Sequence, residues 1–289
     1  MELTLGVTLA VLGAALLHAS WNALIKAGRD PLLDTALVAL AGTVVALPLT
    51  LVVEAPARES WPFIFATVVV HIGYYVALAA AYRLGDLSHA YPIMRGVAPL
   101  LVALVGGFWF AERLQASAWA GVLLICGGVL SLGFVGRSKG RSGGGAARKD
   151  AAATTLWALA GAAIVAAYTL IDAKGVRLSG GAERYVVWLF VFIGLPFGLT
   201  VLATRRGAFL RHAARHWWRG LAGAVMSGLS YGIALWAMTR APVAIVAALR
   251  ETSVLFAALI GAWLLKEGHF KERLLGAAAV LAGLIALKL

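Results

Sequence analysis

Charged residues are scarce in this chain. Only 13% of its 289 residues carry a charge, about half of the ~25% that is usual in soluble globular domains. The hydrophobic residues make up 62% of the sequence, and the mean hydropathy is +0.88. Such a chain has too few polar side chains to cover a globule with a water-compatible surface. A water-soluble fold is therefore excluded, and we expect an integral membrane protein solvated by lipid.

Acidic residues are scarcer still, with 13 Asp and Glu against 25 Lys and Arg, for a formal net charge of +12. The basic residues gather in short gaps between apolar runs, as in residues 137–149 and 205–219. This placement indicates membrane topology and not a nucleic-acid-binding surface, so no nucleic acid is expected as a partner.

Cysteine occurs once, as Cys126 within an apolar run, which excludes a disulfide framework and a thiolate metal site. The sequence also lacks a nucleotide-binding glycine loop, a metal-ligand cluster and a nucleophile with acid and base partners. An ATP-driven pump is thereby excluded, and neither a metal nor a cofactor is expected.

Ten stretches are long and apolar enough to cross a ~30 Å hydrocarbon layer as helices. The first is expected to be a helix and not a signal peptide, because no basic segment precedes it. Short gaps between stretches favour antiparallel neighbours. The sequence thus predicts an all-α membrane protein with ten transmembrane helices, near residues 3–25, 32–53, 62–82, 87–110, 115–135, 152–172, 184–203, 220–239, 242–265 and 271–288.

The chain also contains an internal repeat. At one constant offset Arg95 aligns with Arg250 and Glu112 with Glu267, and glycines such as Gly121 and Gly276 fall in register. Arg and Glu are rare here, so this register is hard to attribute to chance. We expect a first five-helix repeat (1–135), a basic Gly/Ser-rich linker (136–150) and a second five-helix repeat (151–289). An odd number of helices inverts the second repeat, a plan that recurs in alternating-access carriers.

Several motifs resemble those of the ten-helix EamA-type members of the drug/metabolite transporter superfamily. The first repeat has Phe110-Ala111-Glu112 before a glycine-rich helix, the second has Leu264-Leu265-Lys266-Glu267, and the chain opens with His18-Ala19-Ser20-Trp21-Asn22. The resemblance implies a secondary carrier for metabolites or drugs, located in the inner (plasma) membrane of a bacterium. The family pattern places both termini inside, whereas the basic loops favour termini outside.

Ionisable residues inside membrane spans are costly and therefore candidates for function. Arg95 and Arg250 lie near the middle of their spans, and the inverted repeat allows both to reach one cavity, where a guanidinium can bind a carboxylate, phosphate or phosphonate. The alternative is that each arginine pairs with a protein carboxylate or with carbonyls of a broken helix. Glu251 can bind a substrate amine, carry a coupling proton or neutralise Arg95.

Polar and aromatic residues can complete a substrate site around the two arginines. Tyr91 precedes Arg95 by one turn and shares its helix face, while the first helix carries a polar stripe with His18 and Asn22. Each of these residues is also typical of packing or of the membrane interface. The remaining candidates are Trp21 on the first helix, His71, Tyr74 and Tyr75 on the third, Tyr168 and Asp172 on the sixth, and Tyr231 and Trp236 on the eighth.

These observations predict a secondary active transporter, an exporter or exchanger, of small anionic or zwitterionic metabolites such as amino acids or organic acids. The alternative is a multidrug exporter of organic cations in the same superfamily, using Glu251 and an aromatic cage. A membrane-embedded enzyme with His18 and His71 as acid and base is less favoured, so no enzymatic activity is expected. Glu112 and Glu267 are expected to cap or anchor loops. The glycine-rich helices near 115–135 and 271–288 are expected to serve as packing or homodimer faces.

Overall fold

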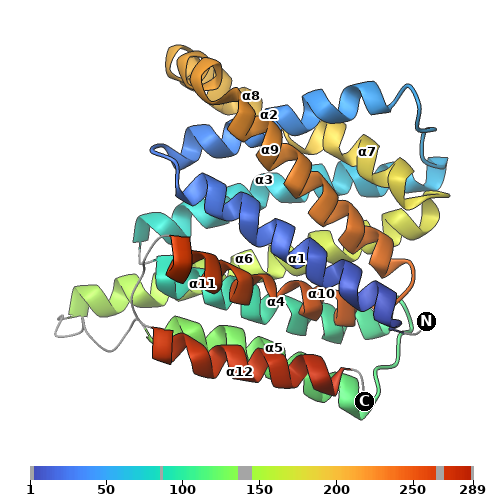
Figure 1. The fold of residues 1–289 in the computed structure, drawn as a ribbon, viewed down its shortest axis with the longest axis vertical. Coiled ribbons are helices and arrows are strands. Elements are labelled where there is room, and N and C mark those ends of the chain that lie inside the picture. The colour runs from blue at the N-terminus through green and yellow to red at the C-terminus, as the bar shows by residue number, and fades with distance from the viewer. Residues whose placement is uncertain (1–2, 85–86, 136–144, 265–269, 288–289) are drawn as a thin grey trace.

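The computed structural model describes residues 3–84, 87–135, 145–264 and 270–287, and these residues form helices joined by short turns (Figure 1). The helices run roughly side by side, and the first begins on the side of the bundle where the last one ends (Figure 1). The helices are α1 (Leu5–Lys26), α2 (Pro31–Leu49), the 3-10 turn η1 (Arg58–Ser60), α3 (Trp61–Leu84), α4 (Leu87–Trp109), α5 (Ala116–Val135), α6 (Gly145–Leu178), α7 (Ala182–Ile193), α8 (Leu195–Thr204), α9 (Arg206–Met238), α10 (Val243–Arg250), α11 (Ser253–Leu264) and α12 (Phe270–Ala286).

Eight segments within the described residues are long and apolar enough to cross a membrane. Three of them combine consecutive elements, η1 with α3, α7 with α8 and α10 with α11. Shorter apolar helices, Ala116–Ser131 within α5 and Gly276–Ala286 within α12, bring the number of membrane segments to ten. The prediction of an all-α membrane protein with ten helices is confirmed.

Polar residues fix the first two helix starts. The Thr4 hydroxyl accepts from the backbone N–H of Val7 at the start of α1. The Asp30 carboxylate accepts from the N–H groups of Leu32 and Leu33 at the start of α2, where Pro31 occupies the first helical position. Such caps satisfy N–H groups that the first turn of a helix leaves unpaired.

Two predicted helices are interrupted, and each interruption has a local cause. The expected helix 184–203 is divided into α7 and α8 at Gly194, followed by Pro196, which cannot donate a backbone hydrogen bond. The expected helix 242–265 is divided into α10 and α11 at Glu251 and Thr252. There the Thr252 hydroxyl donates to the carbonyl of Leu249 at 2.7 Å, which competes with the regular helical ladder.

Two expected gaps contain helix. The basic segment 205–219 was expected to be a loop, but from Arg206 it belongs to α9, which bends at His216 (φ −125°, ψ 20°). Phe209, His212 and His216 recur there at helical spacing, with Phe209 buried against α2. Of the expected linker 136–150, residues 136–144 lie outside the described residues and α6 already begins at Gly145.

The packing exchanges helices between the two halves of the chain. Helix α6 packs on α3 and α4, while α1 packs on α9, α10 and α11, the corresponding helices of the other half. With five membrane segments in each half, this reciprocal packing is the arrangement expected for two inverted repeats. Helix α10 lies at the centre of the main core, where all residues from Val243 to Leu249 are buried.

Helices α5 and α12 pack closely against each other through glycines. A Cβ at Gly128 would lie 2.8 Å from the carbonyl of Gly276, and one at Gly283 would lie 2.8 Å from the carbonyl of Gly121. Only glycine permits such an approach of two backbones. The expectation of a packing role for these glycines is confirmed, with the partner face supplied by the same chain.

Candidate functional site

A narrow cavity lies between α4, α6 and the junction of α10 with α11. It has room for about one water molecule, so the site is closed in this structure. Two arginines, one carboxylate and the hydroxyl-bearing Tyr168 and Thr169 contribute to a wall that is otherwise apolar. The lining residues are Arg95, Ala98, Pro99, Val102, Val165, Tyr168, Thr169, Ala247, Arg250 and Glu251.

Arg95 and Glu251 form a buried ion pair in this cavity. Arg95 Nε lies 2.9 Å from Glu251 Oε2, and the two side chains are 11% and 6% exposed. The contact brings opposite charges together, but its angles are not those of a hydrogen bond. Arg95 Nη2 also donates to the hydroxyl of Ser253 at 3.2 Å. Of the two arrangements considered for Arg95, pairing with a protein carboxylate is the one observed.

Arg250 has a different environment from Arg95. Its guanidinium carbon lies 5.2 Å from the centre of the Tyr231 ring, a cation–π contact. Among the described residues, no carboxylate lies within ion-pair distance of Arg250, whose side chain is only partly buried. Arg250 therefore presents a guanidinium to the cavity whose charge is not neutralised by direct contact.

Asp172 on α6 lies next to this arginine's aromatic partner. It is fully buried, and its Oδ1 accepts from the Thr67 hydroxyl at 2.5 Å and the Tyr185 hydroxyl at 2.7 Å. Its Oδ2 accepts a short hydrogen bond from Tyr231. Tyr231 thus joins Asp172 through its hydroxyl and Arg250 through its ring. The sequence pointed to Asp172 and Tyr231, but gave no indication of Thr67 or Tyr185.

Aromatic residues of α3 and α6 form one side of the site. The His71 and Tyr168 rings lie 4.3 Å apart, and His71 Nδ1 lies 3.0 Å from the Thr67 carbonyl. Tyr168 lines the cavity. Tyr75, in contrast, stacks on Phe197 of α8 with ring centres 4.4 Å apart, so this candidate contributes to helix packing outside the cavity wall.

The candidates on α1 lie close to the arginines. His18 is within electrostatic range of Arg95 and Arg250, and its ring meets Trp21 edge-on at 5.4 Å. The Asn22 amide donates to the His18 carbonyl at 2.8 Å. These three residues form a polar group beside the cavity but do not line it.

Two other candidates lie away from the cavity wall. The Trp236 ring is 4.8 Å from the guanidinium carbon of Arg240, an exposed residue just after the end of α9. Tyr91 lies within electrostatic range of Arg95 without lining the cavity. The structure therefore gathers Arg95, Arg250, Glu251 and Tyr168 in the wall and Tyr231 beside it, and separates Trp236 and Tyr75 from them.

Glu112 connects three helices at one end of the bundle. Its carboxylate accepts from Arg177 Nη2 of α6 at 2.6 Å and from the backbone N–H of Val243 at the start of α10 at 2.9 Å. Arg177 Nε in turn donates to the carbonyl of Met238 at 2.9 Å. The expected anchoring role of Glu112 is observed, and Glu267 lies outside the described residues.

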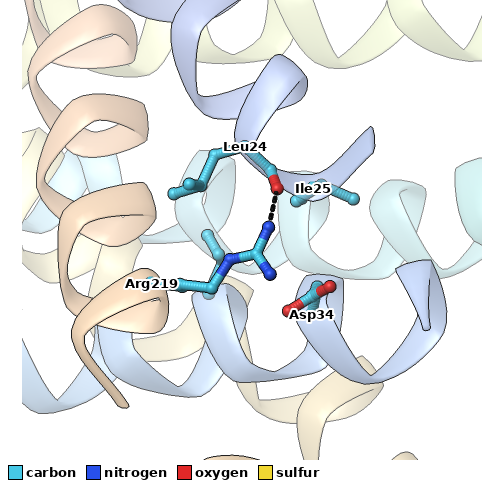
Figure 2. A pocket seen from close by; sticks show the side chains of 5 residues that line it. Leu24, Ile25, Asp34 and Arg219 are labelled. Carbon is cyan, nitrogen blue, oxygen red and sulfur yellow. Dashed lines mark hydrogen bonds between the residues drawn. The ribbon is translucent and has the colours of Figure 1, made fainter. Parts of the chain in front are cut away.

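A second polar cluster lies where α1 ends and α2 begins (Figure 2). Arg219 of α9 donates to the Leu24 carbonyl at 2.5 Å, and His212 lies 2.9 Å from Asp34 Oδ1. Asp34 Oδ2 and Arg219 Nε are buried without a hydrogen bond. These contacts attach the bent segment of α9 to the first two helices.

The described residues contain no group of three His, Cys, Asp or Glu side chains that could hold a metal ion. The central site instead offers a guanidinium, aromatic faces and hydroxyls, which are groups that bind small polar solutes reversibly. Ionisable side chains buried between membrane-spanning helices of both halves of a chain are characteristic of membrane transporters.

The comparisons with known proteins agree with this class. The EamA-like transporter family matches residues 4–134 and 153–289, so the chain belongs to that family. An uncharacterized membrane protein of Bacillus subtilis strain 168, YvdR, is 35% identical over 75 residues, 26% of this chain and 70% of YvdR. The multidrug transporter EmrE of Escherichia coli K12 is 32% identical over 78 residues, 27% of this chain and 70% of EmrE. A solved crystal structure shares the fold, with a TM-score of 0.74 and 19% identity over 98% of both chains.

Proposed function

We propose that this transporter is a secondary active carrier of small anionic or zwitterionic metabolites, such as amino acids or organic acids, and that it acts as an exporter or exchanger. The observation that carries the proposal is the state of Arg250. Its guanidinium faces the cavity without a carboxylate partner among the described residues, whereas Arg95 is neutralised by Glu251. A substrate carboxylate can supply the direct ionic contact that Arg250 lacks, through paired N–H···O bonds.

Alternating access is the mechanism that this arrangement favours. The cavity now holds about one water molecule, so a metabolite can enter only if the helices around it separate. The α10/α11 interruption lies at the cavity wall and supplies a place where the helix can bend. In this mechanism the contacts of Glu112 close the cavity from one end of the bundle, and the contacts of Asp34 close it from the other end.

Export of organic cations is the second candidate, favoured by the name of the E. coli relative, a multidrug transporter. A cation site requires an accessible carboxylate and an open aromatic face. Glu251 in the cavity wall is already paired with Arg95, and the ring of Tyr231 beside the wall already contacts Arg250. Both features favour an anionic group as the substrate's anchor.

Two further expectations belong to the same proposal. We infer that residues 1–135 and 151–289 act as the two moving repeats joined by the segment 136–150, and that the basic side of the bundle faces the cytoplasm, with both termini outside. A proton that is transported together with, or in exchange for, the substrate fits this two-repeat arrangement, and so does assembly as a homodimer.

Ligand-induced thermal stabilisation of the detergent-purified protein tests the substrate class. The ligands are amino acids, organic acids, phosphonates and tetraphenylphosphonium, since a ligand at 100 times its dissociation constant adds about 2.7 kcal/mol of stability. Stabilisation by acids or amino acids that is lost in Arg250→Gln supports the proposal.

Arg240→Gln is the matched control. Arg240 also lies over an aromatic ring, at 4.8 Å, but it is exposed and outside the cavity, so this variant should keep the wild-type response. Stabilisation by tetraphenylphosphonium alone, or an unchanged response to acids in Arg250→Gln, would overturn the anionic assignment.

A further inference from the structure

Asp172 is a buried carboxylate that the cavity wall does not use. We propose that Asp172 is a proton-binding site of the transporter, linked through Tyr231 to the occupancy of Arg250. This inference rests on the proposed function, because the ligand whose binding it senses is the anion held by Arg250.

The surroundings of Asp172 suit a carboxyl group that gains and loses a proton. Among the described residues, its three hydrogen-bond partners are all hydroxyl groups, from Thr67, Tyr185 and Tyr231. A hydroxyl can donate to a carboxylate and can rotate to accept from a carboxylic acid. Both protonation states of Asp172 can therefore be satisfied without any movement of the backbone.

Glu251 is less suited to this role, although it is also buried. It lies 2.9 Å from Arg95 Nε, and a proton on Glu251 would leave that arginine as an uncompensated charge in the core. No arginine or lysine among the described residues contacts Asp172, so its protonation leaves no cation without a partner.

The other titratable groups near Asp172 come from each helix packed around it. Helix α3 contributes His71, which is held by the Thr67 carbonyl and stacked on Tyr168 of α6. Helix α10 contributes Arg250, which lies beyond the Tyr231 ring. We therefore expect the protonation of Asp172 to depend on whether Arg250 holds an anion, with the Tyr231 side chain between the two groups.

Charge balance predicts that anion binding at Arg250 favours protonation of Asp172. The buried site holds two arginines, Arg95 and Arg250, and two carboxylates, Asp172 and Glu251, and is neutral when all four are ionised. A bound anion adds one negative charge in a medium where net charge is costly. One proton taken by Asp172 from a hydronium ion of the surrounding solution restores neutrality: an O–H bond of hydronium breaks, water is left, and the O–H bond of the Asp172 carboxylic acid forms. A zwitterion adds no net charge and requires no proton.

Tyr231 provides the physical connection. Its hydroxyl donates to Asp172 Oδ2 while its ring lies under Arg250. A carboxylate that becomes a neutral acid loosens its hold on this hydroxyl, and the ring is then free to shift with Arg250. Tyr185 donates to the other oxygen of the same carboxylate and makes no contact with Arg250.

The first test needs no ligand. Infrared difference spectra of the purified protein, taken between acidic and alkaline pH, should contain in wild type a carbonyl band of a buried protonated carboxyl group, distinct in frequency from the bands of the solvent-exposed Asp and Glu side chains. The band should be missing in Asp172→Asn, a nearly isosteric variant. Tyr185→Phe and Tyr231→Phe should both retain the band with a changed titration midpoint, and they keep the test valid if Asp172→Asn does not fold.

The second test measures proton uptake with a pH-sensitive dye when monocarboxylates or neutral amino acids are added in weak buffer. We expect uptake of about one proton per monocarboxylate bound and none with neutral amino acids. Asp172→Asn should bind without uptake. Tyr231→Phe should lose most of the uptake, and Tyr185→Phe should keep it.

The outcomes separate the two proposals. A band that persists in Asp172→Asn, or equal uptake in Asp172→Asn and wild type, overturns the proton site even if ligands bind. Equal loss of uptake in both phenylalanine variants overturns the link through Tyr231. If the band depends on Asp172 but no acid or amino acid binds, the proton site stands and the proposed substrate class fails.

Discussion

Removing the charge of Glu251 should destabilise the protein strongly, because it leaves the charge of Arg95 buried without a counter-ion. The pair is separated by 2.9 Å, which corresponds to a gross attraction of about 6 kcal/mol at an effective dielectric constant of ~20. Part of this is offset, since the glutamine no longer has to be desolvated as a charge. Breaking buried pairs costs about 3 to 5 kcal/mol in other proteins, and we expect Glu251→Gln to fall in that range.

Cys126 supplies the assay. It is fully buried on α5, so a fluorogenic thiol reagent labels it only when the helices separate. Labelling during a denaturant or thermal ramp should show the loss of stability in Glu251→Gln. The double variant Arg95→Leu/Glu251→Leu should recover most of it, because it leaves no unpaired charge. A Glu251→Gln protein within about 0.5 kcal/mol of wild type would refute the assignment of this pair as a buried structural contact.

Three further predictions concern the rest of the bundle. Glu112→Ala removes an ion pair and the hydrogen bond to the start of α10, and should cost about 2 to 3 kcal/mol of stability. The control Glu54→Ala removes a pair whose carboxylate is 75% exposed, and should cost at most about 1 kcal/mol. Thiol-labelling melts that fail to separate the two variants would contradict the anchoring role. Gly128→Leu should force α5 and α12 apart at a cost of about 1 to 3 kcal/mol of stability. The control Gly127→Leu, where a Cβ meets nothing within 4 Å, should melt like wild type. Equal melts of the two variants would argue against close packing of α5 on α12. In Ala214→Cys, an impermeant maleimide should label the exposed side of α9 only after cells are opened, and labelling of intact cells would reverse the orientation.

The fold was largely predictable because two strong signals act together. Apolar runs of helical length and the register of Arg95 with Arg250 are both properties of the chain itself. The bent start of α9 was missed, although Phe209, His212 and His216 recur at helical spacing, because the surrounding arginines suggested a loop. The interruption after Arg250 had no proline or glycine to indicate it, and the Thr252 hydroxyl that bonds to the Leu249 carbonyl there is a weak signal in a sequence.

The site was predictable only in part, because the sequence does not show how deep in the membrane a residue lies or which residues of different helices meet. Helical spacing shows which residues share a face, but it does not show where along the span the cavity lies. Trp236 follows Tyr231 by five residues, which places it about 7.5 Å further along the axis and on another face, next to Arg240 and outside the cavity. The hydroxyl donors to Asp172 come from α3, α7 and α9, and no pattern within one helix reveals such a meeting.

Transport by reconstituted protein is the most direct test of the central claim that Arg250 binds the substrate's anionic group. Proteoliposomes loaded with the acid or amino acid that stabilises the wild type would be assayed for counterflow of the labelled compound. We predict counterflow in wild type and Arg240→Gln, and none in Arg250→Gln that still melts cooperatively. Undiminished counterflow in Arg250→Gln, or counterflow of tetraphenylphosphonium instead of acids, would contradict the account.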